Sequence, residues 1–282
     1  MAIIMKGADV AVRMKDMLLA KAAKLKSAGI TPTLAVVRVG SREDDLVYER
    51  AILKRFSVLG LTVQVHELPQ DITQPDFDEQ FMRVNDDPSV HGILLFRPLP
   101  EGLSDTYACL HMNPDKDIDG MNPVNAARLF AGKTNGFAPC TPGAVMTMLA
   151  QYGYDVAGKN VVIVGRSMVV GRPLAMLMLR ANATVTVCHS QTHNLPEVCK
   201  QADIVIASAG HPRMLTPEYF SRKSVVVDVG INVDENGNLC GDVDFDRVER
   251  VVQAVSPVPG GVGSVTTSVL AEHLLRAAKT LG

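Results

Sequence analysis

The sequence predicts an α/β fold of two domains, each a mostly parallel sheet flanked by helices. Short runs rich in β-branched residues alternate with segments whose apolar residues recur at helical spacing, a pattern typical of parallel sheets covered by helices. The length of 282 residues is sufficient for two compact domains. The second half shows the strand–turn–helix–strand order of a Rossmann-like nucleotide-binding unit.

Three strands and two helices are expected in the first half of the chain. Gly60 ends the first of these helices, because glycine readily adopts the left-handed conformation of a helix C-cap. Prolines punctuate the stretch from residue 98 to residue 142, which predicts a loop-rich middle. The expected strands are Thr33–Val39, Thr62–Leu68 and Val90–Phe96, and the expected helices are Leu46–Leu59 and Gln74–Asn85.

The second half alternates strands and helices. Thr141 and Pro142 fit the N-cap and the first position of a helix that leads into it. We expect residues 1–142 and 265–282 to form one domain and residues 143–264 to form a Rossmann-like domain. The expected helices are Gly143–Tyr152, Pro173–Ala181 and Ser268–Leu281, and the expected strands are Asn160–Val164, Thr184–Cys188, Ile204–Ala207 and Val225–Val229.

Composition argues against several classes of protein. The formal net charge is −2 and both signs are interspersed, so the chain lacks the basic stripe of a nucleic-acid-binding protein. No run of about 20 apolar residues is present to span a membrane. The five cysteines are scattered without a CxxC pair, which indicates reduced thiols and a cytoplasmic location.

The turn from Gly165 to Gly171 is the first candidate site. A strand, a short turn and a helix in this order aim backbone N–H groups and the positive end of the helix dipole at a pyrophosphate, and glycine permits a close approach. The spacing is G-x-S-x-x-x-G rather than G-x-G-x-x-G. On this motif alone, an ordinary tight turn is an equal alternative.

The end of the following strand bears on which dinucleotide binds. An NAD site often has Asp or Glu there for the ribose 2′-hydroxyl, whereas the 2′-phosphate of NADP needs donors and positive charge. Here the strand ends in Cys188-His189-Ser190 without a carboxylate, and Arg166 lies in the first turn. The pattern favours NADP over NAD, with a strand-end cap as the alternative role for Ser190.

The sequence gives no support for a metal site. The run from Asp115 to Gly120 imitates the start of an EF-hand loop, but Ala126 stands where a bidentate Glu is required. The seven histidines show no ligand spacing on one helical face. A carboxylate in this run is better explained as a polar anchor for a ligand or as a turn former.

Two other segments keep alternatives open. Three glycines within Pro259–Gly263 indicate close approach of the backbone to a flat ligand, or else a flexible loop before the last helix. Tyr48 begins the spacing of a Tyr-x-x-x-Lys pair, but Ile52 occupies the lysine position. Half-buried packing is therefore an alternative role for Tyr48, and Lys54 is the nearest substitute amine.

Seven ordered segments together resemble the methylenetetrahydrofolate dehydrogenase/cyclohydrolase family of one-carbon metabolism. They follow the family order across nearly the whole chain. The segments are Asn113–Gly120, Pro139–Pro142, Val164–Pro173, Thr184–Ser190, Val227–Asn232, Gly241–Asp244 and Pro257–Gly263.

The resemblance implies a homodimer whose chains bind a tetrahydrofolate and NADP between two α/β domains. It implies that residues 1–142 with 265–282 bind the folate, and residues 143–264 bind NADP. It assigns catalytic positions to Tyr48, which stacks on the folate, and to Asp119, which binds the pterin. It further assigns Phe96, Pro259, Gly260, Gly261 and Gly263 to the substrate wall, and Gly165, Arg166, Ser167, Gly171, Ser190 and Ile231 to the cofactor.

The departures from the family pattern fall on the folate side. Ile52 replaces the lysine that drives hydrolysis in the family, and Phe96 replaces the glutamine that supports this lysine. Asp44-Asp45 replaces the usual Ala-Ser, and Ser264 replaces the usual proline. The segments on the cofactor side match the family.

We therefore expect NADP-dependent oxidation of 5,10-methylenetetrahydrofolate to 5,10-methenyltetrahydrofolate, with cyclohydrolase activity weak or lost. Hydride transfer needs alignment but no protein base, whereas hydrolysis needs proton transfers that Ile52 and Phe96 cannot perform. One alternative is a bifunctional enzyme that forms 10-formyltetrahydrofolate, with Lys54 as the amine. Others are a non-catalytic paralogue that binds NADP or folate, and a dehydrogenase of another small substrate.

Overall fold

The computed structural model describes residues 1–282, which divide into two compact units. Unit 1 comprises Met1–Val12 and Thr141–Thr266, and unit 2 comprises Arg13–Cys140 and Thr267–Gly282. Each unit has its own parallel sheet, so the expected α/β class with parallel sheets is confirmed.

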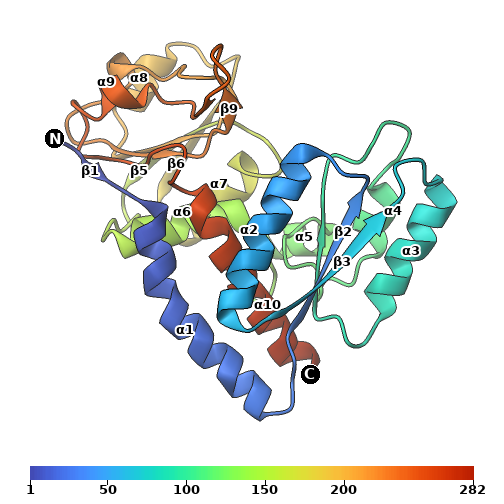
Figure 1. Cartoon of the computed structure of the whole chain (residues 1–282). Coiled ribbons are helices and arrows are strands. Elements are labelled where there is room, and N and C mark those ends of the chain that lie inside the picture. The colour runs from blue at the N-terminus through green and yellow to red at the C-terminus, as the bar shows by residue number, and fades with distance from the viewer. The chain divides into compact units, whose positions relative to one another are not determined.

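A three-stranded parallel sheet forms the centre of unit 2 (Figure 1). Its middle strand, β2, is buried along its whole length and pairs with β3 on one side and β4 on the other. Helices connect the strands, as parallel pairing requires. The strands are β2 (Thr33–Val39), β3 (Thr62–Leu68) and β4 (Gly92–Leu95), and the helices are α2 (Glu43–Leu59), α3 (Gln74–Asp86), α4 (Thr106–His111) and α5 (Pro123–Phe130).

Apolar side chains of β2, β4, α3 and α4 form a core of unit 2. Phe77 and Phe81 of α3 are fully buried there, one helical turn apart on the face that covers the sheet. Thr73 begins α3, because its hydroxyl accepts a hydrogen bond from the backbone N–H of Asp76 at 3.3 Å. Gly60 ends α2 with a φ of 65°, which confirms the expected left-handed cap.

A six-stranded parallel sheet in the order β1-β11-β8-β7-β5-β6 forms unit 1. The chain leaves β5 for β6 on one side and then returns to β7 on the other side. Such a reversal creates a crevice beyond the carboxyl ends of the strands, where open α/β sheets bind ligands. The strands are β1 (Ile3–Ile4), β5 (Asn160–Val164), β6 (Thr184–Cys188), β7 (Ile204–Ala207), β8 (Val225–Asp228) and β11 (Ala254–Val255).

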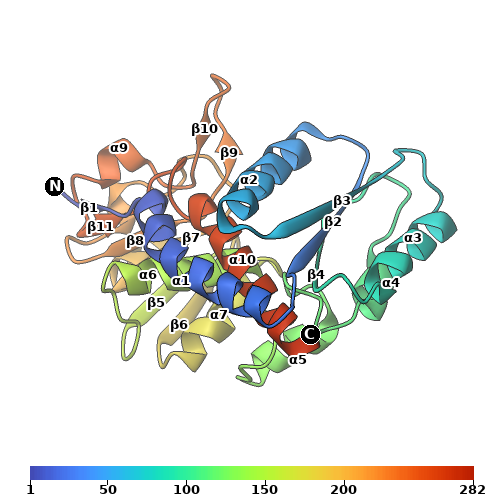
Figure 2. The ribbon, with the colours of Figure 1, turned by 60° about the horizontal axis from the view of Figure 1, so that its bottom comes forward.

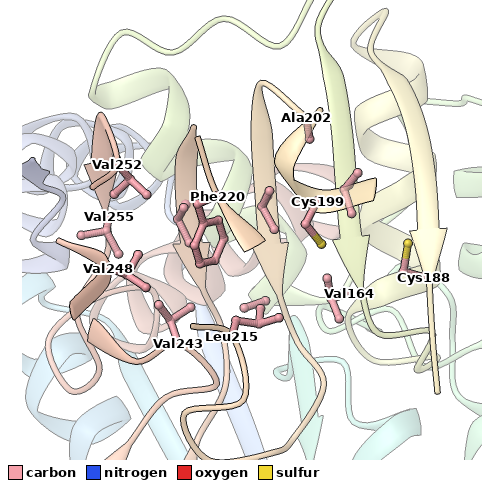
Figure 3. Packing of buried hydrophobic residues seen from close by; sticks show 14 residues of the cluster. Val164, Cys188, Cys199, Ala202, Leu215, Phe220, Val243, Val248, Val252 and Val255 are labelled. Atoms are coloured by element: carbon pink, nitrogen blue, oxygen red, sulfur yellow. The ribbon is translucent and has the colours of Figure 1, made fainter. Parts of the chain in front are cut away.

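Buried side chains from the strands of unit 1 and from the segments after β6, β7 and β8 form a second core (Figure 3). Cys199, Phe220 and Val248 contribute to it from outside the sheet. A short antiparallel hairpin of β9 and β10 follows β8 (Figure 2). The remaining elements are α7 (Gly171–Arg180), α8 (Leu195–Lys200), a 3₁₀ turn (Pro217–Tyr219), β9 (Asn232–Val233), β10 (Leu239–Cys240) and α9 (Phe245–Val248).

Three helices contain the boundaries between the two units along the chain: α1 (Gly7–Ser27), α6 (Cys140–Gln151) and α10 (Gly263–Leu281). The long helix α1 was not expected. Residues 1–12, which we expected in the other domain, belong to unit 1 because β1 pairs with β11. None of the helices combines the length and the apolarity needed to cross a membrane.

Helices α2, α6, α7 and α10 begin two to five residues earlier than the sequence predicts. Helix α6 starts at Cys140, so that Thr141 and Pro142 lie within its first turn instead of at its N-cap. Helix α10 starts at Gly263 rather than at Ser268. Its first turn already forms at the end of the glycine-rich loop, Pro259–Gly263, where the N–H of Val265 donates to the carbonyl of Val262 at 2.8 Å.

Candidate functional site

The turn from Gly165 to Gly171 in unit 1, which we call the phosphate turn, can form only with glycine at both of its ends. Gly165 has a φ of 133°, and a Cβ added to it would overlap the backbone of Ser208, the residue that follows β7. A Cβ added to Gly171 would overlap the carbonyl of Gly165, so α7 starts directly against the end of β5. These contacts bring the N-terminus of α7 close to the carboxyl end of the sheet, as pyrophosphate binding requires.

Ser167 shapes the turn between these glycines. Its hydroxyl accepts a hydrogen bond from the N–H of Val170 at 3.0 Å, and its carbonyl accepts one from the N–H of Arg172 at 3.0 Å. Arg166 and Ser167 are exposed, and the first turn of α7 carries no acidic residue. The positive end of the helix dipole therefore has no intrinsic counter-charge, which fits the binding of an anionic pyrophosphate.

Ser190 lies exposed just beyond β6, and it does not cap the strand end. Its neighbours do so instead: the N–H of His189 donates to the hydroxyl of Thr192 at 2.9 Å, and the N–H of Gln191 donates to Nδ1 of His189 at 3.2 Å. The Ser190 hydroxyl makes no hydrogen bond in the structure, which leaves it available to a ligand.

The glycine-rich loop is held by the beginning of α1, a contact within unit 1 that sequence reasoning missed. The N–H of Gly7 donates to the carbonyl of Gly260 at 2.8 Å, and a Cβ added to Gly7 would overlap the carbonyl of Gly261. Gly261 is buried by this packing, whereas Pro259, Gly260 and Gly263 are exposed. The loop is therefore fixed on one side and open on the other.

Unit 2 places Tyr48 on α2, where its ring stacks on that of Phe96 with a centroid distance of 5.6 Å and an interplanar angle of 30°. One turn further along the same helix face, Ile52 is fully buried. Lys54 is exposed, since two residues correspond to about 200° around a helix. The space at Ile52 is therefore apolar, and the side chain of Lys54 points away from it.

Helix α2 is tied to the sheet next to Tyr48. The guanidinium of Arg38, at the end of the buried strand β2, donates to Glu49 of α2 at 2.8 Å and to Glu67 of β3 at 2.9 Å. The side chain of Arg38 is only 6% exposed, so the pair with Glu49 is shielded from solvent and orients α2 firmly. The neighbouring Tyr48 is thereby fixed in position.

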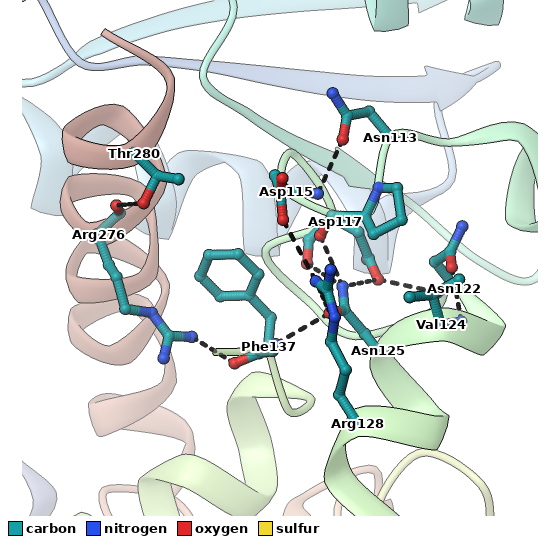
Figure 4. A network of polar contacts seen from close by, with 12 residues as sticks. Asn113, Asp115, Asp117, Asn122, Val124, Asn125, Arg128, Phe137, Arg276 and Thr280 are labelled. Carbon is teal, nitrogen blue, oxygen red and sulfur yellow. Dashed lines mark hydrogen bonds and ion pairs between the residues drawn. The ribbon is translucent and has the colours of Figure 1, made fainter. Parts of the chain in front are cut away.

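Asp117 and Asp119 lie in one loop but have different surroundings. Asp117 is fully buried and accepts hydrogen bonds from the N–H groups of Met121 and Asn122 and from the Asn125 amide, at 2.8–3.0 Å (Figure 4). It is the turn former of the run that imitates an EF-hand. Asp119 is only half-buried, which leaves it accessible to a ligand.

Asp119 also lies against the start of α6. Its Oδ1 accepts a hydrogen bond from the N–H of Cys140 at 2.8 Å, while the protein surroundings raise the pKa of its carboxyl by desolvation. His273 of α10 lies against the same loop and donates from Nδ1 to the carbonyl of Ile118 at 2.9 Å. Burial lowers the pKa of His273 to about 4, so this imidazole is neutral near pH 7.

The structure thus distributes the expected site residues over the two units. Unit 2 holds Tyr48, Phe96 and Asp119, and unit 1 holds the phosphate turn and the glycine-rich loop. Ile231 is 71% exposed in the segment after β8. Cys140 was within a segment that signalled the family, whereas Gly7, Arg38 and His273 carried no motif and depend on tertiary contacts.

Two family models match the chain in succession. The catalytic domain of tetrahydrofolate dehydrogenase/cyclohydrolase matches residues 5–119, and the NAD(P)-binding domain of the same family matches residues 139–281.

Curated relatives are similar over nearly their full length. The bifunctional protein FolD of Alkaliphilus oremlandii (strain OhILAs) is 48% identical over 276 residues, which cover 98% of this chain and 97% of the relative. The bifunctional protein FolD of Clostridium botulinum (strain 657 / Type Ba4) is 48% identical over 279 residues, which cover 99% of each.

Solved structures agree with the fold of the whole chain. The bifunctional enzyme FolD from Campylobacter jejuni matches with a TM-score of 0.96 and 38% identity, covering 99% of each chain. The FolD of Trypanosoma brucei, solved with an NADP cofactor and an inhibitor, matches with a TM-score of 0.92 and 33% identity, covering 99% of this chain and 98% of the other. The similarity extends over both units.

Proposed function

Because the chain belongs to the tetrahydrofolate dehydrogenase/cyclohydrolase family, we propose that it oxidises 5,10-methylenetetrahydrofolate to 5,10-methenyltetrahydrofolate with NADP as the acceptor. When bound, NADP accepts the hydride that leaves the methylene carbon of the folate. The lone pair of a folate nitrogen stabilises the cation that remains, so this step needs no protein base. The chain's residues bind and align the folate and NADP, and they exclude water.

The phosphate turn supports NADP as the dinucleotide. Gly165 and Gly171 allow the backbone to approach a pyrophosphate, and no acidic side chain opposes it in the first turn of α7. Arg166 and the unbonded hydroxyl of Ser190 supply the charge and the donor that a 2′-phosphate requires. The NADP complex of the related Trypanosoma brucei enzyme supports the same choice.

For the folate side we propose that Tyr48 stacks on the substrate and that Asp119 binds the pterin. Tyr48 is half-buried and held by its contact with Phe96, which leaves part of its ring exposed. Asp119 is accessible and has a raised pKa, as functional carboxyl groups often do. We assign the exposed part of Pro259–Gly263 to the substrate wall as well.

Hydrolysis of the methenyl product to 10-formyltetrahydrofolate is the second candidate activity. The relatives at 48% identity are named bifunctional, which favours a chain that performs both reactions over a dehydrogenase alone. Ile52 and Phe96 remove the polar pair that promotes the second reaction in the family, and they favour a slow hydrolytic step. We therefore propose that the chain performs both reactions and that hydrolysis is the slower of the two.

The test supplies 5,10-methylenetetrahydrofolate and NADP and follows NADPH, the methenyl product and the formyl product separately. We expect NADPH and the methenyl product to appear together and the formyl product to lag. No NADPH formation would overturn the proposal and leave a non-catalytic binding protein. Formyl product that keeps pace with NADPH would show full bifunctionality.

The assembly and the location of the protein follow from the same proposal. We propose a homodimer, as the family resemblance implies, and a cytoplasmic location. All five cysteines are free thiols, and four of them are buried, which suits a reducing compartment. Sedimentation of the purified chain at micromolar concentration tests the dimer, which a purely monomeric species would exclude.

A further inference from the structure

Two carboxylates are buried behind the carboxyl ends of β7 and β8 in unit 1. Asp228 ends β8 and is 2% exposed, and Asp242 follows β10 and is fully buried. Sequence reasoning gave neither of them a role. Buried carboxylates are costly unless hydrogen bonds compensate them, so their partners indicate what they are for.

Asp242 accepts hydrogen bonds from three consecutive backbone amides after β7. Oδ2 accepts from Ala209 and from Gly210, the latter at 3.1 Å, and Oδ1 accepts from His211 at 3.0 Å. Oδ1 also accepts from the side-chain amide of Asn232 at 2.9 Å. All four partners are donors, which an ionised carboxylate can satisfy and an amide cannot.

These partners lie next to residues that we assign to the cofactor. Ser208, which precedes the three amides, contacts Gly165 and donates from its N–H to the carbonyl of Val164 at 2.8 Å. Asn232 directly follows the exposed Ile231. Asp242 therefore fixes two segments, one against the phosphate turn and one that carries Ile231.

Asp228 in turn fixes Asp242. Its Oδ1 accepts from the N–H of Gly230 at 2.9 Å and of Asp242 at 3.1 Å, and its Oδ2 accepts from the N–H of Val243 at 2.9 Å. A Cβ added to Gly230 would overlap the carboxylate of Asp242, and one added to Gly241 would overlap that of Asp228. Burial raises the pKa of Asp228 to about 7, against the lowering effect of its N–H donors.

We propose that Asp242, held in place by Asp228, is a positioning residue for the nicotinamide dinucleotide site. It sets the backbone of residues 209–211 and 230–232, and thereby the shape of the site beside the phosphate turn. The proposal rests on the proposed function, because it assumes that these segments border the bound NADP. It assigns the Gly241–Asp244 segment to cofactor binding rather than to folding alone.

The test is the variant Asp242→Asn, with Asp246→Asn as the matched control. Asn places an NH₂ group against backbone donors, so part of the network is lost. Asp246 is exposed and makes no hydrogen bond, so the control should bind NADP as the wild type does. We expect calorimetry to show about a tenfold weaker Kd for NADP in Asp242→Asn, with the Kd for tetrahydrofolate within about twofold of the wild type.

A general loss of stability would lower the fraction of folded protein, but it would not weaken the binding of NADP more than the binding of tetrahydrofolate. An unchanged Kd for NADP in folded Asp242→Asn would overturn the proposal, as would an equal loss of both affinities. Failure of the wild type itself to bind NADP would instead overturn the cofactor assignment, and the inference with it.

If Asp242→Asn does not fold, the variant Asn232→Ala tests the positioning role of Asp242 instead. This variant removes one partner of Asp242 and leaves the backbone network intact. We expect a Kd for NADP about threefold weaker and an unchanged Kd for tetrahydrofolate, because Asn232 is one of four donors to Asp242 and the three backbone donors remain. NADP binding at wild-type strength in this variant would overturn the proposal.

Discussion

The phosphate turn of unit 1 and the α2–β4 region of unit 2 differ in how closely they resemble the family pattern. The turn keeps Arg166 and both glycines that its backbone contacts demand, and Ser190 beyond β6 has an unbonded hydroxyl. In the other region Ile52 and Phe96, which are buried and apolar, stand where the family resemblance implies a polar pair. This difference is the basis of our proposal that the chain binds and aligns a hydride acceptor but transfers protons slowly.

The largest expected effect comes from restoring the polar pair. Ile52→Lys combined with Phe96→Gln should accelerate hydrolysis of 5,10-methenyltetrahydrofolate by about 10²–10⁴-fold, the usual contribution of a general acid–base group. The measurement is the rate at which the methenyl compound disappears when this enzyme is the only one present. Lys54→Met is the control and should hydrolyse at the wild-type rate, since Lys54 is exposed.

Two results would contradict the proposed roles of Ile52, Phe96 and Lys54 in hydrolysis. A folded double variant with wild-type hydrolysis would show that the family pair is not what limits the reaction. Loss of hydrolysis in Lys54→Met would show that Lys54 supplies the amine after a shift of α2.

The phosphate turn should be the most sensitive part of unit 1. Gly171→Ala places a Cβ against the carbonyl of Gly165, so that α7 must move away from β5. We expect kcat/KM for NADP to fall about 100-fold, as misplacement by about 1 Å can cause. Urea unfolding should show a loss of about 1–3 kcal/mol from the same overpacking. Unchanged steady-state kinetics would contradict the assignment of the turn.

Selectivity between the dinucleotides should change by a smaller factor. Arg166→Ala removes the positive charge expected at the 2′-phosphate and should reduce the NADP-to-NAD ratio of kcat/KM about tenfold, equivalent to one charge-assisted hydrogen bond. Arg172→Ala is a suitable control, because the Arg172 guanidinium lies exposed against the sulfur of Met168. Equal losses with both dinucleotides would place Arg166 outside the 2′-phosphate site.

The smallest expected effect is a pH dependence of stability that arises from the burial of His273, close to Asp119. His273 has a folded pKa of about 4, below the value of about 6.5 for a free histidine. Between these values only the unfolded chain takes up the proton, so stability falls as the pH falls. From about pH 7.5 to about pH 6 this amounts to about 0.8 kcal/mol.

His273→Asn keeps a donor for the carbonyl of Ile118 but does not titrate. Urea midpoints of both proteins at the two pH values should therefore show that this part of the pH dependence disappears in the variant. An identical pH dependence in both would mean that water reaches His273.

The sequence predicts the strands of the fold well and the helix ends less well. β2, β3, β5, β6 and β7 have the expected bounds, because their β-branched runs are bounded by turn residues. Helix α1 was missed although Val10, Met14 and Leu18 are buried at helical spacing, a signal that was there to find. The start of α10 was misplaced because three glycines suggested loop where the helix already begins.

The site divides in the same manner. Residues on the phosphate turn carry a local motif, whereas Asp242 has its partners at residues 209–211, far along the chain. Backbone amides have no signature in a sequence, so a side chain that binds them is found only in the folded molecule. The opposite orientations of Ile52 and Lys54 likewise needed the helix in place.

The proposed function is tested most directly by the time course of NADPH, 5,10-methenyltetrahydrofolate and 10-formyltetrahydrofolate after the wild-type protein is mixed with 5,10-methylenetetrahydrofolate and NADP. We expect NADPH to rise at once, the methenyl compound to accumulate with it, and the formyl compound to follow slowly. Absence of NADPH, or formyl product in step with NADPH and no methenyl accumulation, would contradict the proposed function.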